Sequence, residues 1–231
     1  MAINDQVKFT WVGHGTWKVR TARGKDMLID PWVTTNPVAP DHLKAIDRLD
    51  IMLITHGHSD HVADAVEIAR ATHPKVLAPF EVGACLTKQG VEDVIAFGKG
   101  GTMEVDGISF TMVHAEHFSS TPDGASAGEP VGYVIQFENG FKIYFSGDTD
   151  VFGDMALIRE LDQPEVAFLS IGDFYTMGAR RAAKAVELLG VKTVVPMHFG
   201  TFPALHGTPA QLEELAGPGV TVLDIKPGDE V

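Results

Sequence analysis

The chain has very little cysteine. Cys85 is the sole cysteine among 231 residues, so no disulfide can form within the chain. A lone thiol excludes a small disulfide-stabilised scaffold and is compatible with a reducing compartment. Basic residues are also scarce, since 18 Lys and Arg face 31 Asp and Glu and the formal charge is −13. This balance argues against a general affinity for nucleic acid or for anionic membranes, because both require a basic surface.

Long apolar runs are missing as well. No run approaches the ~18 residues of a membrane span. The first six residues lack a basic region followed by an apolar core, so no signal peptide is evident. We therefore expect a cytoplasmic protein that binds a small-molecule substrate and neither nucleic acid nor membrane, and a homo-oligomer stays open. The 45% hydrophobic content is ample for a core, and the length fits a single domain over residues 1–231.

Short apolar runs between glycine and proline breakers predict strands, and apolar residues at helical spacing predict helices. The two kinds of element occur in both halves of the chain, which predicts a layered α/β architecture. The predicted strands are 7–12, 17–20, 27–30, 50–54, 75–78, 94–97, 108–114, 131–137, 141–145, 166–170, 193–196 and 220–225. The predicted helices are 61–71, 152–161, 179–189 and 209–216, with a further helical stretch at 80–86.

The most informative motif follows the predicted strand 50–54. His56, His58, Asp60 and His61 lie within six consecutive residues. Imidazole nitrogens and a carboxylate oxygen are ligands that zinc accepts, and a turn at a strand end can direct several of them inward. Four such groups are too many for one catalytic ion, so the motif indicates two adjacent ions. The alternative is a polar loop that caps the next helix, with Ser59 or Asp60 at the N-cap.

Other segments supply candidates to complete the ligand set. Asp148 follows the predicted strand 141–145, and a carboxylate with two oxygens can bridge two cations; its alternative role is a helix N-cap. His198 follows an apolar strand, where open α/β sheets commonly place functional groups. The segment 113–117 offers His114 and His117, and spacing alone does not decide between them.

Two further residues lie at strand ends. His14, between two glycines, is a candidate for a catalytic or substrate contact, or for a structural role in its loop. Asp30 ends the predicted strand 27–30. A buried carboxylate there needs partners, so a hydrogen bond to a ligand histidine competes with simple turn capping.

Together these residues resemble the metallo-β-lactamase superfamily. Its five ordered motifs have counterparts in Asp30, the cluster 56–61, His117, Asp148 and His198. The segments 13–15, 28–31, 146–149, 171–173, 176–178 and 196–198 are similar to those of small metal-dependent hydrolases related to ascorbate-6-phosphate lactonases. In that branch serine typically follows the third histidine. Here Phe118 separates His117 from Ser119, and His117 is still preferred over His114.

The resemblance implies a four-layered αββα sandwich and two divalent metal ions, zinc first, with manganese or iron as alternatives. One ion would be held by His56, His58 and His117, the other by Asp60, His61 and His198, with Asp148 between them. The expected enzyme is a hydrolase that uses a metal-bound hydroxide, oriented by Asp60, on a small ester, lactone or amide. Asp173 and Thr176 are candidate substrate contacts, although Asp173 also fits a capping role. The alternatives are a phosphodiesterase acting on a small phosphodiester and a non-hydrolytic iron redox protein.

Overall fold

The computed structural model describes residues 2–231, which fall into two compact units. Unit 1 consists of Met1–Gly101, Phe118–Pro130 and Lys226–Val231, and unit 2 consists of Thr102–His117 and Val131–Ile225. The prediction of one domain over the whole chain stays a prediction. Within residues 2–231, none of the helices combines the length and the apolar character needed to cross a membrane.

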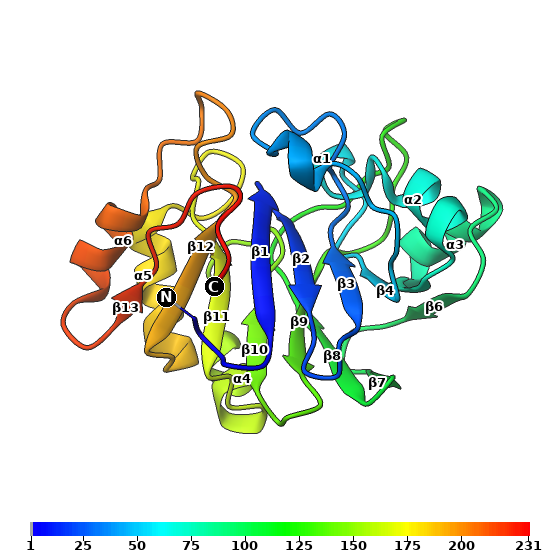
Figure 1. Ribbon diagram of the computed structural model, residues 1–231. Coiled ribbons are helices and arrows are strands. Elements are labelled where there is room, and N and C mark those ends of the chain that lie inside the picture. The colour runs from blue at the N-terminus through cyan, green and yellow to red at the C-terminus, as the bar shows by residue number, and fades with distance from the viewer. Residues whose placement is uncertain (1) are drawn as a thin grey trace. The chain divides into compact units, whose positions relative to one another are not determined.

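Unit 1 is built on a six-stranded sheet whose strands follow one another in chain order (Figure 1). The first three strands pair antiparallel and the last three continue the sheet in parallel. The C-terminal residues return to the edge of this sheet, where Phe9 and Val231 exchange two backbone hydrogen bonds. The strands are β1 (Lys8–Gly13), β2 (Thr16–Arg20), β3 (Asp26–Ile29), β4 (Ile51–Leu53), β5 (Lys75–Pro79) and β6 (Val94–Phe97).

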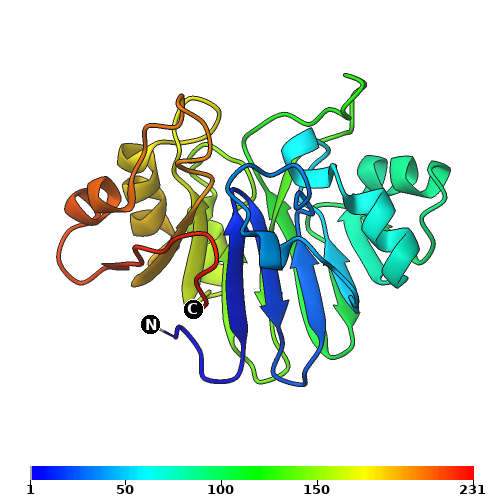
Figure 2. The ribbon, with the colours of Figure 1, turned by 45° about the horizontal axis from the view of Figure 1, so that its top comes forward.

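Helices α2 (Ala65–Thr72) and α3 (Phe80–Lys88) lie beside the strands of this unit (Figure 2). Ile68 of α2 and Leu86 of α3 share a buried cluster with Met52 and Val76 of the sheet. The remaining helical elements are η1 (Asp41–Leu43) and α1 (Ser59–Val62). The predicted helix 61–71 is therefore two helices. The chain breaks near Asp64, whose buried carboxylate accepts hydrogen bonds from the loop at residues 33–34.

Unit 2 is built on a seven-stranded sheet with the order β13-β12-β11-β10-β9-β8-β7. Pairing is antiparallel from β7 to β10 and parallel from β10 to β13. The predictions missed β7, although Asp106 and Gly107 both have positive φ, as a tight hairpin turn requires. The strands are β7 (Thr102–Val105), β8 (Ile108–His114), β9 (Val131–Gln136), β10 (Lys142–Phe145), β11 (Val166–Ser170), β12 (Thr193–Met197) and β13 (Thr221–Val222).

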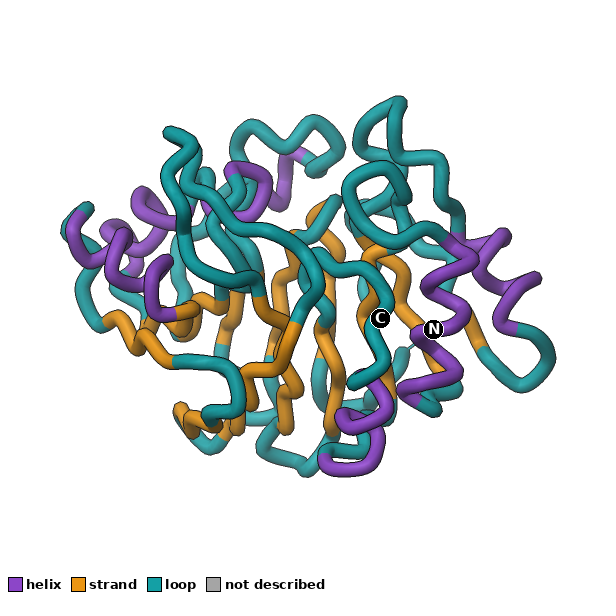
Figure 3. The backbone as a smooth tube through the Cα atoms, turned by 180° about the vertical axis from the view of Figure 1, so that it is seen from behind, coloured by secondary structure: helices purple, strands orange, loops and turns teal. Residues whose placement is uncertain are grey.

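Three helices cover one face of the unit 2 sheet: α4 (Met155–Leu161), α5 (Ala179–Leu189) and α6 (Pro209–Ala216). Ala182 and Val186 of α5 and Leu212 of α6 pack against Leu169 and Val194 of the strands. Figure 3 shows the backbone from behind, with helices, strands and loops in separate colours. Because β10, β11 and β12 are parallel, their carboxyl ends lie at one edge of the sheet, and the candidate residues of unit 2 are attached there.

Candidate metal centre

In unit 1 the histidine cluster occupies the loop between β4 and α1 and the first turn of α1. His56 Nε2 lies 2.9 Å from His58 Nδ1, and the rings of His56 and His61 have centroids 4.1 Å apart. His56 and His61 are fully buried. Three imidazoles this close together, two of them fully buried, form a donor set that suits a divalent cation.

Asp30 and Thr55 determine how two of these histidines are oriented. Asp30 Oδ2 lies 2.8 Å from His61 Nδ1, and its two oxygens also accept hydrogen bonds from the backbone N–H and the hydroxyl of Thr55, at 2.8 and 2.7 Å. The Thr55 hydroxyl oxygen lies 3.0 Å from His56 Nδ1. Burial raises the pKa of Asp30, while His61 and Thr55 act in the opposite direction. We assign Nδ1–H tautomers to both histidines, which makes Nε2 the nitrogen with a lone pair that a cation could bind.

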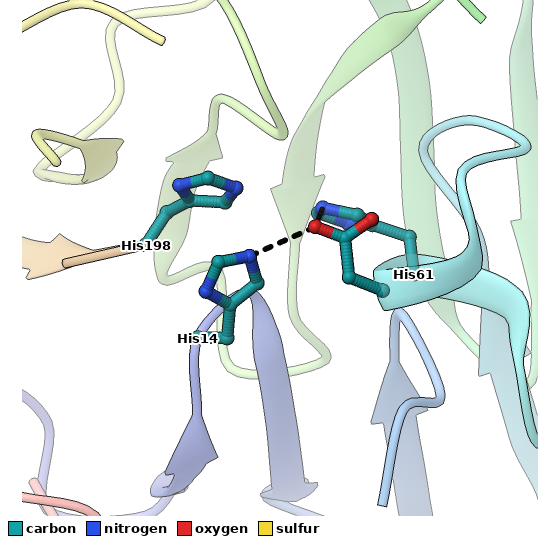
Figure 4. Close-up of side chains that lie close together, drawn as sticks. His14, His61 and His198 are labelled. Atoms are coloured by element: carbon teal, nitrogen blue, oxygen red, sulfur yellow. Dashed lines mark hydrogen bonds and ion pairs between the residues drawn. The ribbon is translucent and has the colours of Figure 1, made fainter. Parts of the chain in front are cut away.

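His14 lies at the turn between β1 and β2 of the same unit. Its Nε2 is 3.0 Å from Asp60 Oδ2, the contact drawn as a dashed line in Figure 4, and its backbone has φ 57°. His61 Nε2 is 4.0 Å from the same carboxylate oxygen. The capping role considered for Ser59 and Asp60 is wrong. His58 is the N-cap of α1, and no side chain makes a capping hydrogen bond there.

In unit 2 two histidines converge on one carboxylate. Asp148 follows β10, and its Oδ2 lies 2.9 Å from His198 Nε2 and 3.8 Å from His117 Nε2. Asp148 and His198 are buried at 3% and 1% exposure, so this charged group lies out of contact with bulk water. Asp148 is not a helix N-cap, because Asp154 has that position in α4. A buried carboxylate between two imidazoles is a donor set suited to a cation.

Comparison with known proteins identifies the family. The family described as beta-lactamase superfamily domain matches residues 25–199. A UPF0173 metal-dependent hydrolase of Koribacter versatilis is 49% identical over 229 residues, which cover 96% of this chain and 97% of that protein. The chain belongs to the UPF0173 metal-dependent hydrolases. A UPF0173 metal-dependent hydrolase of Rubrobacter xylanophilus is 47% identical and covers 97% of this chain.

Solved structures agree with this membership. Igni18, a metallo hydrolase from Ignicoccus hospitalis, shares 36% identity over 97% of each chain, with a TM-score of 0.85. YhfI of Bacillus subtilis, a metallo-beta-lactamase fold protein, has a TM-score of 0.75 at 15% identity over 98% of this chain and 100% of its own, which shows the fold alone. The predictions of the metallo-β-lactamase superfamily, of its α/β fold and of a metal-dependent hydrolase are therefore confirmed.

Within this family fold, His114 and His117 are placed differently. His117 has a 5% exposed side chain directed at Asp148. His114 is the last residue of β8, is 43% exposed and contacts Glu116 at 3.2 Å. The structure therefore brings His117 and not His114 to the carboxylate of unit 2. The ligand role of His117 stays a prediction.

The sequence predictions missed Thr55 and Thr149, which hold the candidate loops. Thr55 connects Asp30 to His56, as described above. Thr149 accepts a hydrogen bond from the backbone N–H of Glu116 at 2.9 Å, next to His117 in the chain. Each threonine occurs beside a predicted ligand, just after an apolar strand, and this position is the signal that could have identified them.

The predicted substrate contacts Asp173 and Thr176 lie on the loop that connects β11 to α5 in unit 2. Asp173 has φ 66°, and its side chain accepts a hydrogen bond from the backbone N–H of Phe174 at 2.9 Å. Its carboxylate thus bonds within its own turn and does not cap α5, whose N-cap is Gly178. Thr176 is half-buried, and its hydroxyl lies 3.4 Å from the carbonyl of Met177. The substrate-binding role of both residues stays a prediction.

Proposed function

We propose that the chain is a binuclear metal-dependent hydrolase of small esters, lactones or amides. The proposal rests on one observation. Each unit contains a group of potential metal-donor side chains, and these side chains belong to the five motifs on which the resemblance is based. In unit 1 the tautomers of His56 and His61 direct Nε2 away from their supporting residues. In unit 2 two histidines approach one buried carboxylate. The chain belongs to a family named for metal-dependent hydrolysis, and this membership supports the proposal that both donor sets serve one metal-dependent reaction.

The proposed ligand sets are those that the family motifs imply. By that resemblance, one ion would be held by His56, His58 and His117 and the other by Asp60, His61 and His198, with Asp148 as the shared carboxylate. Zinc is the proposed metal, because nitrogen and oxygen donors in this number suit it, and the same donors accept manganese or iron. The chemistry of the residues present therefore fits the metal that the family requires.

When bound, a pair of divalent ions makes water a nucleophile at neutral pH and polarises the substrate oxygen, so the protein needs no nucleophile of its own. The residues of the chain then have positioning tasks. Asp30 holds His61 in the tautomer that ligates. His14 holds Asp60 at 3.0 Å, so that this carboxylate keeps one orientation toward the reacting water. Burial of His14, His56 and His61 keeps bulk solvent from competing for these contacts.

Two alternatives use the same ligands. A phosphodiesterase would attack a phosphorus centre, and an iron redox protein would exchange electrons. The fold alone does not distinguish these reactions, because one fold can host several chemistries. A diiron beta-hydroxylase, CmlA of Streptomyces venezuelae, shares this fold at 18% identity, and an isothiocyanate hydrolase from Delia radicum gut bacteria shares it at 23%. Hydrolysis of a small molecule is preferred, because the family name specifies hydrolysis and the net charge of −13 opposes a nuclease that acts on a long polyanion.

The test combines metal content with a substrate screen. Protein reconstituted separately with zinc, manganese and iron is expected to bind close to two ions per chain. It is also expected to hydrolyse at least one member of a panel of lactones, esters, thioesters, amides and small phosphodiesters. Asp148→Ala should lower the ion content, whereas Asp154→Ala, at the start of α4, should not. Saturation of the wild type at one ion would exclude the binuclear proposal, and turnover of phosphodiesters alone would support the first alternative.

A further inference from the structure

The loop between β11 and α5 displays two aromatic side chains at the ligand-bearing edge of unit 2. Phe174 is 68% exposed and Tyr175 is 54% exposed, and their rings meet edge to face with centroids 4.7 Å apart. Side chains of this size are usually buried in part, because each carries a large apolar area. Their exposure shows that packing within unit 2 does not account for them.

The two ends of this loop are attached to the candidate ligand loops. The backbone N–H of Met177 donates to the carbonyl of Thr149, the residue after Asp148, at 3.0 Å. At the other end, a Cβ on Gly172 would lie 2.1 Å from the carbonyl oxygen of His198, so the two backbones are in close contact. The aromatic pair is therefore held in a constant relation to Asp148 and His198.

The backbone of the loop that carries the aromatic pair is strained. Asp173 and Phe174 have φ of 66° and 60°. Asp, Asn and His tolerate this left-handed region because their side chains can bond locally, whereas a bulky apolar residue there is an outlier. Among the non-glycine residues with positive φ in residues 2–231, Phe174 is the one without a polar side chain. Strained backbone of this kind persists where the surrounding structure holds it in place, and it clusters at binding and catalytic sites.

We propose that Phe174 and Tyr175 bind an apolar group of the substrate and so determine specificity. The inference rests on the proposed function, and it narrows the substrate class to small acyl compounds that carry an alkyl or aryl group. Covering two exposed rings with an apolar group removes both surfaces from water, which strengthens binding. The carboxyl group released by hydrolysis would lie toward Asp148 and His198, and the apolar group toward the rings.

The test uses zinc-reconstituted protein and two variants, Phe174→Asn and Tyr175→Ala. The substrates are the p-nitrophenyl esters of acetate, butyrate and hexanoate. For the wild type, kcat/KM is expected to rise with chain length. Each variant should lose about tenfold or more on the hexanoate ester, and less than threefold on the acetate ester. Leu161→Ala is the control, because Leu161 is 75% exposed on α4 of the same unit, away from the loop.

Direct binding separates this inference from the proposed function. Calorimetric titration with hexanoate and acetate is expected to show tighter binding of hexanoate to the wild type, and no such preference in the variants. If the wild type hydrolyses none of the esters, the ester function fails, and the titration still decides the role of the loop. Equal chain-length dependence in wild type and variants would overturn the inference.

Thermal unfolding distinguishes binding from a structural role. Asn adopts the left-handed conformation more readily than Phe, so Phe174→Asn should have a Tm equal to or above that of the wild type. A fall in Tm of more than about 4 °C, the size expected for one or two lost interactions in a chain of this length, would assign the ring to packing and overturn the proposal.

Discussion

Asp30 Oδ2 lies 2.8 Å from Nδ1 of His61, and both side chains are buried within unit 1. Asp30 directly follows β3 and His61 belongs to α1, so the contact joins two residues that are 31 positions apart in the chain. The carboxylate orients the imidazole, and in the proposed metal site this contact makes Nε2 the ligand atom. The contact also explains why Asp30 has φ 48°, because this conformation is part of the turn that places the carboxylate under the histidine cluster.

Replacing Asp30 by Asn should weaken metal binding. An amide in place of the carboxylate removes the negative charge that stabilises the Nδ1–H tautomer of His61. We expect metal affinity to fall about 10- to 100-fold, as for other residues that support ligand histidines. Competition with a chelator measures the affinity. Asp50→Asn is the control, because Asp50 is a hydrogen-bonded carboxylate of the same unit outside the histidine cluster. An unchanged affinity for Asp30→Asn would contradict the proposed role.

His117→Ala and His114→Ala form a matched pair. Because His117 is buried beside Asp148 and His114 is 43% exposed beside Glu116, only the first substitution should lower metal content. Metal analysis of both variants after dialysis against dilute zinc gives the comparison. If His114→Ala loses metal and His117→Ala does not, the ligand assignment must be reversed.

His14→Asn tests the contact with Asp60. Asn tolerates the left-handed backbone that His14 adopts, so the turn between β1 and β2 should persist. We expect kcat/KM to fall about 10- to 100-fold, because Asp60 loses its imidazole partner, with ion content unchanged. Steady-state kinetics and metal analysis on the same preparation are the measurements. Loss of one ion per chain would contradict a role of His14 confined to orienting Asp60.

Gly172→Ala should disturb His198 through the backbone. The new Cβ would lie 2.1 Å from the carbonyl oxygen of His198, a distance that forces the two segments apart. We expect a loss of about 2 kcal/mol in the free energy of unfolding, or about 4–8 °C in Tm, together with weaker metal binding. Gly153→Ala is the control in the same unit, because its Cβ would meet nothing within 4 Å. Equal Tm values for the two variants would contradict this prediction.

Asp50 should contribute to stability in a pH-dependent way. Partial burial by itself would raise the pKa of Asp50, but the backbone N–H of Asp26 and the side chains of Lys25 and Arg48 lower it below 3.8. The ionised form therefore stabilises the fold above pH 3.8, and this contribution is lost as the pH falls through the lower folded-state pKa.

The variant Asp50→Asn should consequently be less stable than the wild type at pH 7, by about 1 kcal/mol. The difference should shrink as the pH is lowered below about 4. Denaturant unfolding of both proteins from pH 3 to 7 measures it. A difference that stays constant over this range would show that the carboxylate charge does not contribute.

Much of the fold could be predicted from local patterns. Strand β11 and helix α5 were predicted with their observed bounds. The strand is an unbroken apolar run, and the helix has apolar residues at helical spacing between two glycines. Strand β7 was missed, because Thr102–Val105 alternates over only four residues and its hairpin partner had to be identified first. The break before α2 was also missed, since it depends on hydrogen bonds between Asp64 and residues 33–34, a contact across 30 residues.

The sequence by itself determined which metal-binding residue types the chain carries and where along the chain they occur. The order of these candidate ligands and their positions at strand ends follow from short segments such as 56–61, because a strand that ends in a turn delivers its next residues to the sheet edge regardless of the rest of the chain. The tertiary structure alone decided which residues meet. It placed His117 and not His114 beside Asp148, joined Asp30 to His61, and left Phe174 strained and exposed. Such contacts depend on strand order and on loops packed from distant parts of the chain, and no local pattern contains that information.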